Sequence, residues 1–175
     1  MKGLVLSRSS GLEVRMCAIE KIISGGQTGA DQGGLEAGKA LGLMTGGTAP
    51  PRFITEVGSC KRLLESFGLV EGKRDPRIYP LRTEANVFNS DGTVVFGVVS
   101  SAGSRLTLQM CRQYKRPWFL VTTPESHDEL TIKAFWVWLE DNEVSVLNVA
   151  GNRESKGRGL QERVRLFLVA ALKGN

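Results

Sequence analysis

Two stretches of the chain combine glycine with groups that can bind an anion. The first, residues 25–29 (GGQTG), has glycines whose backbone can take positive φ and approach a ligand closely. The second, residues 151–159 (GNRESKGRG), carries Arg153 and Lys156 among glycines, and arginine can bind an oxyanion through two parallel hydrogen bonds. Together these stretches predict a site for a phosphate-like group.

The elements around the first stretch would aim it at a ligand. The apolar residues 21–24 are too few for a helix and predict a buried strand. From Ala30 onward, small and apolar residues recur at helical spacing, at Gly34, Leu35, Gly38 and Leu41. A strand, a glycine loop and a helix in this order direct free backbone N–H groups and the positive end of a helix dipole toward an anion.

The same residues also have structural interpretations. The glycines could form only a tight turn, and Gln27 and Thr28 could cap the helix. Asp31 is favoured in a first helical turn whatever its function. Because its charge would repel a phosphate placed directly against it, we expect Asp31 to contact sugar hydroxyls or to support the loop. Arg105 could pair with a surface carboxylate.

Apolar strands and helices alternate along the rest of the chain. We expect further strands at 43–47, 93–99, 117–122 and 143–149, and helices at 59–67, 82–89, 125–141 and 160–172, with residues 52–80 otherwise irregular. This alternation predicts an α/β fold of three layers, Rossmann-like, with a mostly parallel sheet flanked by helices. Ligands bind such sheets at the carboxyl ends of the strands, where both glycine stretches and a third small-residue loop, 100–104 (SSAGS), fall.

Composition bounds the function. The chain has 175 residues, 41% hydrophobic content and a net charge of +5, which suit one domain with an anionic ligand. We expect that domain to span 20–175, with 1–19 a disordered lead or an added edge segment. Cys17, Cys60 and Cys111 form no metal or redox motif, so we expect no metal site and an intracellular, cytoplasmic location. No apolar stretch reaches membrane-spanning length.

Two familiar nucleotide motifs do not fit. A dinucleotide site needs GxGxxG and an acidic residue at the end of the second strand, and the chain has neither. Residues 33–40 (GGLEAGKA) contain half of a Walker A motif but lack its Ser or Thr and fall inside the predicted helix. We interpret this run as a helix face of small residues.

Six blocks carry a family resemblance. They are 23–31 (ISGGQTGAD), 46–47 (GG), 79–87 (YPLRTEANV), 90–96 (SDGTVVF), 102–107 (AGSRLT) and 147–156 (LNVAGNRESK). In this order they resemble the putative molybdenum carrier, or molybdenum cofactor carrier-like, family. That family belongs to the Rossmann-like superfamily that includes the lonely-guy phosphoribohydrolases.

The resemblance implies a nucleotide-like or molybdopterin-like phosphorylated ligand over the three loops. The phosphoribohydrolases carry a glutamate in Pro-Gly-Gly-x-Gly-Thr-x-x-Glu, and residues 101–107 have none nearby, which argues against hydrolysis. Asp31 and Glu84 are the nearby candidates for acid–base chemistry. The candidate ligand-binding residues are Gly25, Gly26, Gln27, Thr28, Gly29, Asp31, Gly46, Gly47, Glu84, Gly103, Ser104, Arg105, Thr107, Asn148, Gly151, Arg153, Ser155 and Lys156.

Two classes of function therefore remain. We favour a binding or carrier protein that requires no cofactor of its own and whose cargo is a phosphorylated small molecule such as molybdenum cofactor. The alternative is a nucleotide-processing hydrolase acting on an N-glycosidic or phosphate-ester bond. A membrane partner is not expected, and nucleic acid is disfavoured because no aromatic platform accompanies the cations. Residues 135–139 (FWVWL) are apolar around the whole helix, which indicates core packing or a homo-oligomer contact in a dimer or tetramer.

Overall fold

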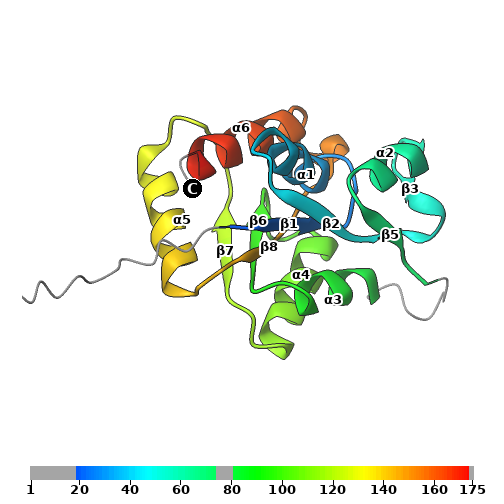
Figure 1. Cartoon of the computed structure of the whole chain (residues 1–175), viewed down its shortest axis with the longest axis horizontal. Coiled ribbons are helices and arrows are strands. Elements are labelled where there is room, and N and C mark those ends of the chain that lie inside the picture. The colour runs from blue at the N-terminus through cyan, green and yellow to red at the C-terminus, as the bar shows by residue number, and fades with distance from the viewer. Residues whose placement is uncertain (1–18, 74–80, 174–175) are drawn as a thin grey trace, which may run out of the picture.

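A six-stranded parallel sheet forms the centre of the protein. The structure is a computed structural model, and it describes residues 19–73 and 81–173. The strands follow the order β5-β2-β1-β8-β6-β7 (Figure 1). They are β1 (Lys21–Ser24), β2 (Met44–Ala49), β5 (Leu69–Glu71), β6 (Gly92–Phe96), β7 (Trp118–Val121) and β8 (Val146–Gly151).

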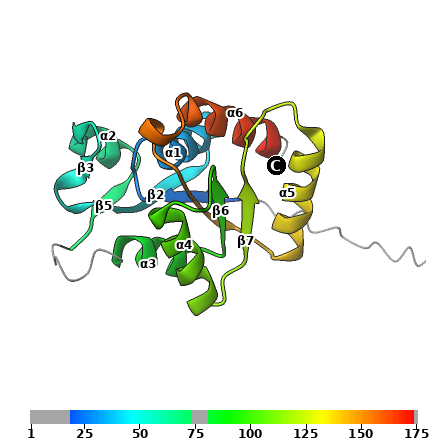
Figure 2. The ribbon, with the colours of Figure 1, turned by 180° about the vertical axis from the view of Figure 1, so that it is seen from behind.

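Helices cover both faces of this sheet, as Figures 1 and 2 show from opposite sides. On the upper face lie α1 (Ala30–Ala40) and α6 (Leu160–Leu172), and α5 (Glu129–Asp141) packs against α6 near β7. On the lower face lie α3 (Leu81–Phe88) and α4 (Ala102–Gln113). Smaller elements are η1 (Pro51–Phe53), the hairpin of β3 (Ile54–Thr55) and β4 (Gly58–Ser59), α2 (Lys61–Ser66) and η2 (Glu154–Lys156). The predicted three-layer α/β architecture is confirmed.

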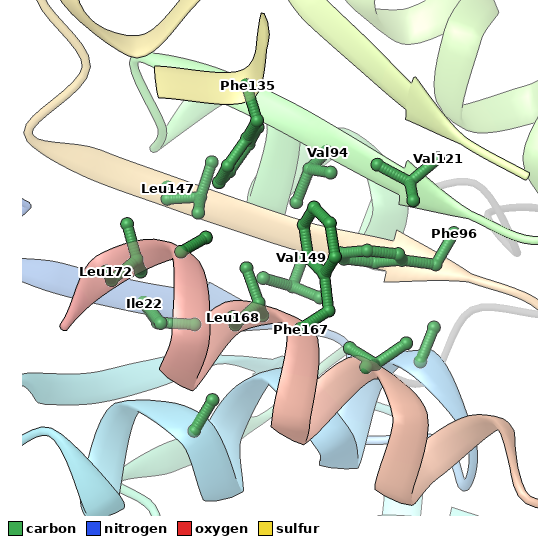
Figure 3. Close-up of a cluster of buried hydrophobic side chains, with 14 of the residues drawn as sticks. Ile22, Val94, Phe96, Val121, Phe135, Leu147, Val149, Phe167, Leu168 and Leu172 are labelled. Carbon is green, nitrogen blue, oxygen red and sulfur yellow. The ribbon is translucent and has the colours of Figure 1, made fainter. Parts of the chain in front are cut away.

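The main core lies between the sheet and the upper helices. Phe96 and Phe135 both pack against Phe167 of α6, and all three side chains are fully buried (Figure 3). The glycines of α1 let this helix lie very close to α6 and β8. A Cβ on Gly33 would lie 2.4 Å from the carbonyl oxygen of Gln161 in α6, and one on Gly34 would lie 2.6 Å from Val149 in β8. The run that resembles a Walker motif is thus a packing face inside a helix.

Several element boundaries differ from the predicted ones. Strand β6 ends at Phe96 because Gly97 turns the chain with a φ of 91°, whereas the sequence predicted a strand to residue 99. Helix α5 begins at Glu129 and not at residue 125, since the Asp128 carboxylate accepts a hydrogen bond from the Thr131 amide at 3.1 Å and caps the helix there. Residues 52–73 hold more structure than predicted, including the edge strand β5.

Some predictions concern parts of the chain that the structure leaves out. Residues 1–18 of the expected lead lie outside the described residues, and so do residues 74–80 of the predicted irregular segment. Ile19, the last residue of that lead, is buried in the core. In the 135–139 segment Phe135 and Leu139 are buried while Val137 is 47% exposed, and the oligomeric state stays a prediction. In the described ranges, no helix is both long enough and apolar enough to traverse a bilayer.

Candidate functional site

The three glycine loops meet at one edge of the sheet. They follow β1, β6 and β8, which are neighbours in the order β1-β8-β6. The connection from β1 runs through α1 to β2 on one side, and the connection from β6 runs through α4 to β7 on the other. Open α/β sheets bind ligands where the winding direction reverses in this way. The predicted meeting of the loops at the carboxyl ends of the strands is confirmed.

Two adjoining cavities open at this edge. The loop compartment, of about 340 Å³, lies among the glycine loops and is bordered by Gly25, Gly103 and Gly151. The edge compartment, of about 590 Å³, lies toward β5 and is bordered by the apolar side chains of Pro50, Pro51, Ile54, Leu81 and Ala85 and by polar ones that include Glu56, Glu71 and Lys73. Three side chains border both cavities: Gln27, Arg82 and Arg153. One elongated ligand could therefore occupy both compartments.

Cations dominate the loop compartment. Arg82 comes from α3, and Arg153 and Lys156 come from the stretch after β8 that includes η2, so two segments far apart in the chain converge on one cavity. The N-terminal residues of α4, Ala102 and Gly103, border the same cavity, and a Cβ on Gly103 would meet nothing within 4 Å. First-turn N–H groups of a helix and converging cations are the groups that bind phosphate.

Asp31 is the carboxylate that borders the loop compartment among the described residues. Its side chain is only 7% exposed, and its Oδ2 accepts a hydrogen bond from the Gln27 amide at 3.2 Å. Burial raises its pKa to about 6, against the opposing effects of Arg82, of the Gln27 hydrogen bond and of Arg153. A Cβ on Gly25 would lie 2.8 Å from the same oxygen and 3.2 Å from Arg82 Cζ, so only glycine fits between them. Asp31 can thus hold or release a proton near neutral pH.

Asp31→Asn should remove a pH dependence of stability. Between the ordinary pKa of 3.8 and the native value of about 6, the folded state binds more protons than the unfolded state. The free energy of unfolding of the wild type therefore falls as pH rises through this window, by about 3 kcal/mol. Asparagine carries no charge and can still accept the Gln27 hydrogen bond. Urea denaturation at about pH 4 and about pH 7.5 should show the variant gaining about 3 kcal/mol relative to the wild type. A pH-independent difference would contradict this account.

Glu56 joins two of the loops, and the sequence did not indicate it. Its carboxylate accepts hydrogen bonds from the Thr28 hydroxyl and from both the amide (3.1 Å) and the hydroxyl of Ser155. Burial acts to raise the pKa of Glu56, but the hydrogen bonds from Ser155 and Thr28, with Arg153 nearby, outweigh it and lower the pKa. Glu56 is therefore ionised and holds the β3–β4 hairpin against the loops.

Asparagine side chains fix the positions of the surrounding strands. Asn86 exchanges two hydrogen bonds with the backbone of Thr48, and Asn152 does the same with Val98. Thr48 lies in β2 beyond its last pairing with β1, and Val98 lies just past the end of β6, so each asparagine replaces a missing strand partner. Asn148, which borders the loop compartment, donates to the Thr93 hydroxyl at 3.1 Å. The cavity walls are therefore tied together by buried amides.

The structure separates the predicted site residues into two groups. Those bordering the compartments are Gly25, Gln27, Asp31, Gly103, Thr107, Asn148, Gly151, Arg153 and Lys156. Those bordering neither compartment are Gly26, Thr28, Gly29, Gly46, Gly47, Glu84, Ser104, Arg105 and Ser155.

The second group has other contacts. A Cβ on Gly26 would strike Leu69, and one on Gly29 would strike the backbone of Asn152. Glu84 accepts a hydrogen bond from the Tyr114 hydroxyl, and Arg105 donates to the carbonyl of Ser100. Whether any residue of either group binds a ligand stays a prediction.

Arg82 is the second residue that sequence reasoning missed. It lies in the block 79–87 that carried the family resemblance, but only Glu84 was selected from that block. Arg82 borders both compartments, whereas Glu84 points to Tyr114. Helical spacing in 81–88 could have separated these two side chains, because residues two apart in a helix do not share a face.

The fold and the site define a Rossmann-like α/β protein with a ligand cavity at the topological switch point. Residues 22–172 match the model of the circularly permutated YpsA SLOG family, and the chain belongs to that family. The crystal structure of a putative molybdenum carrier protein from Syntrophus aciditrophicus SB is similar, with a TM-score of 0.79 and 33% sequence identity. The similarity covers 89% of this chain and 96% of that chain. No curated protein matches the chain significantly.

Proposed function

We propose that the protein is a carrier that binds a phosphorylated small molecule, nucleotide-like or molybdopterin-like, and does not convert it. The observation that carries this proposal is the pairing of two unlike compartments through Arg82 and Arg153. A phosphorylated heterocycle has the same two parts, an anion at one end and a flat, largely apolar group at the other. The loop compartment suits the first part and the edge compartment suits the second.

Electrostatics support the phosphate end. Three positive charges border the loop compartment, those of Arg82, Arg153 and Lys156. Among the described residues, Asp31 is the one carboxylate that borders it, and Asp31 is partly protonated near neutral pH. A phosphate there would be met by guanidinium groups and by the N-terminal N–H groups of α4. Protonated Asp31 would donate a hydrogen bond to the ligand where ionised Asp31 would repel its charge.

Size and polarity support the heterocycle end. A volume of about 590 Å³ lies within the range of ligand pockets, about 300–1,000 Å³, and apolar side chains that can contact a ring share its lining with polar ones. Pro50, Pro51 and Ile54 form one wall, and Leu81 and Ala85 of α3 form another. A planar ring buried there would lose water from both faces.

The relative with a solved structure supports a molybdenum-related cargo. It is described as a putative molybdenum carrier protein, and we extend that description to this chain as a proposal. In residues 19–73 and 81–173 no three His, Cys, Asp or Glu side chains group as metal ligands would. The protein would accordingly hold molybdenum cofactor through its phosphate and pterin parts, with the metal carried by the cargo.

Asp31 favours a second candidate, a hydrolase acting on a nucleotide-like substrate. A carboxyl with a pKa of about 6 that borders a ligand cavity can act as a general acid or base. Glu84, the other candidate from the sequence, borders neither compartment. Steady release of free base, or of inorganic phosphate, from a nucleotide would favour this candidate over the carrier.

The test is a thermal-shift panel of nucleotides, phosphorylated pterins, molybdenum cofactor and simple oxyanions. A ligand at about a hundred times its dissociation constant should add about 2.7 kcal/mol to the free energy of unfolding and raise Tm by several degrees. Arg153→Gln should abolish most of the rise. Arg158→Gln, which removes the same charge from the same loop at a residue bordering neither compartment, should preserve it. Equal behaviour of the two variants, or no rise with any compound, would contradict the proposal.

A further inference from the structure

The Glu56 carboxylate occupies a group of donors that resembles an anion site. Three donors converge on it, the hydroxyls of Thr28 and Ser155 and the amide of Ser155. Thr28 lies in the loop after β1, and Ser155 lies in the stretch after β8. Arg153, two residues before Ser155, adds a positive charge that favours the ionised carboxylate. Hydroxyls, a backbone amide and a guanidinium are the groups with which proteins bind phosphoryl oxygens.

Glu56 belongs to a segment with few attachments. The hairpin of β3 and β4 has only two residues in each strand, and Val57 and Gly58 at its tip are exposed. Among the described residues, its other hydrogen-bonded link to the site loops is the Gln27 side chain, which bonds the carbonyl of Ile54 (3.3 Å) and the amide of Glu56 (3.2 Å). A segment with so few buried contacts opens at a small cost in free energy.

Backbone strain lies at the base of the same hairpin. Arg52 and Phe53 are consecutive non-glycine residues with positive φ, 57° and 53°. Such conformations are disfavoured for residues with a Cβ and persist only where surrounding contacts hold them. Phe53 is buried beside Leu64 and Leu69, so this end of the segment is fixed while the tip depends on Glu56 and Gln27. Loss of the Glu56 contacts would therefore free the tip of the hairpin while its base stays in place.

We propose that Thr28, Ser155 and Arg153 form a second phosphoryl subsite, which Glu56 fills in the unliganded protein. This inference rests on the proposed function, because it adds a second anion position to the same site, at the side of the edge compartment that Glu56 borders. Arg153 borders both compartments and lies near Glu56, so it can contact two linked phosphoryl groups at once. The ligand class is therefore a pyrophosphate-containing compound, whose second phosphoryl group displaces Glu56 and releases the hairpin tip.

The test compares inorganic pyrophosphate with inorganic phosphate by isothermal titration. Glu56→Gln keeps the shape of the side chain but removes the competing charge, and it should raise pyrophosphate affinity about tenfold more than phosphate affinity. Glu65→Gln, the same charge change on α2 at a residue bordering neither compartment, controls for the general electrostatic effect and should leave this ratio unchanged. Adding Ser155→Ala to Glu56→Gln should cancel the gain.

Other outcomes separate this proposal from the proposed function. An equal gain for both anions, no gain, or a loss would overturn the second subsite while leaving Arg153-dependent phosphate binding in place. If phosphate binding by the wild type does not depend on Arg153, the proposed function itself fails. Hydrogen exchange on the unmodified protein gives an independent readout: pyrophosphate, but not phosphate, should speed exchange of the amides at 54–59. Unchanged or slower exchange would overturn the proposal.

Discussion

Gly47→Ala is expected to destabilise the protein by about 4 kcal/mol, close to the upper end for single substitutions. Gly47 lies in β2 with a φ of 125°, and a Cβ there would lie 2.1 Å from the carbonyl oxygen of Ser24 and 2.8 Å from its amide nitrogen. The backbones of Gly47 and Ser24 cannot move apart easily, because β1 is paired with both β2 and β8. The clash must therefore distort the sheet at the strand end that carries the first glycine loop.

Gly42→Ala is the matched control for this prediction. Gly42 also has a positive φ, 72°, but a Cβ there would meet nothing within 4 Å. Only the left-handed backbone conformation is penalised, at a cost of about 1 kcal/mol. Urea denaturation of the two variants should therefore separate a steric cost from a conformational one. Similar losses of stability in both variants would show that Gly47 does not lie against the Ser24 backbone.

The positions of the three glycine loops were predicted correctly from the sequence. Glycine runs at the ends of apolar segments indicate turns, and parallel strands bring such turns to one edge. Which glycines face a cavity could not be predicted, since that depends on the neighbours of each Cα. Gly103 opens into the loop compartment, while Gly47 packs against Ser24 and Gly29 against Asn152.

The two charged residues that sequence reasoning missed depend on long-range contacts. Glu56 lies 99 positions from Ser155 in the chain, and no local pattern relates them. Arg82 reaches the loops only because α3 packs beneath β2, where Asn86 bonds Thr48. Thr28 and Ser155 were among the predicted ligand-binding residues, and in the structure both donate hydrogen bonds to a carboxylate of the chain itself.

Short elements also escaped prediction for a physical reason. Strand β5 has three residues, too few to show an alternating or continuous apolar pattern, and its place at the sheet edge comes from pairing Leu69 with Gly47. Longer elements had enough periodicity: the predicted helix 160–172 coincides with α6. Tertiary pairing, and not local preference, therefore decides the place of β5.

Titration of a nucleoside 5′-monophosphate and of its two fragments shows whether one ligand spans both compartments. The edge compartment should bury about 100 Å² of ring surface, which corresponds to about 2.5 kcal/mol or roughly a hundredfold in affinity. We therefore expect the nucleotide to bind about a hundredfold more tightly than inorganic phosphate, and the nucleoside alone to bind weakly. Arg82→Gln, at the junction of the compartments, should remove most of the nucleotide's affinity. If the nucleoside binds as tightly as the nucleotide, or phosphate as tightly as either, the two compartments do not form one site.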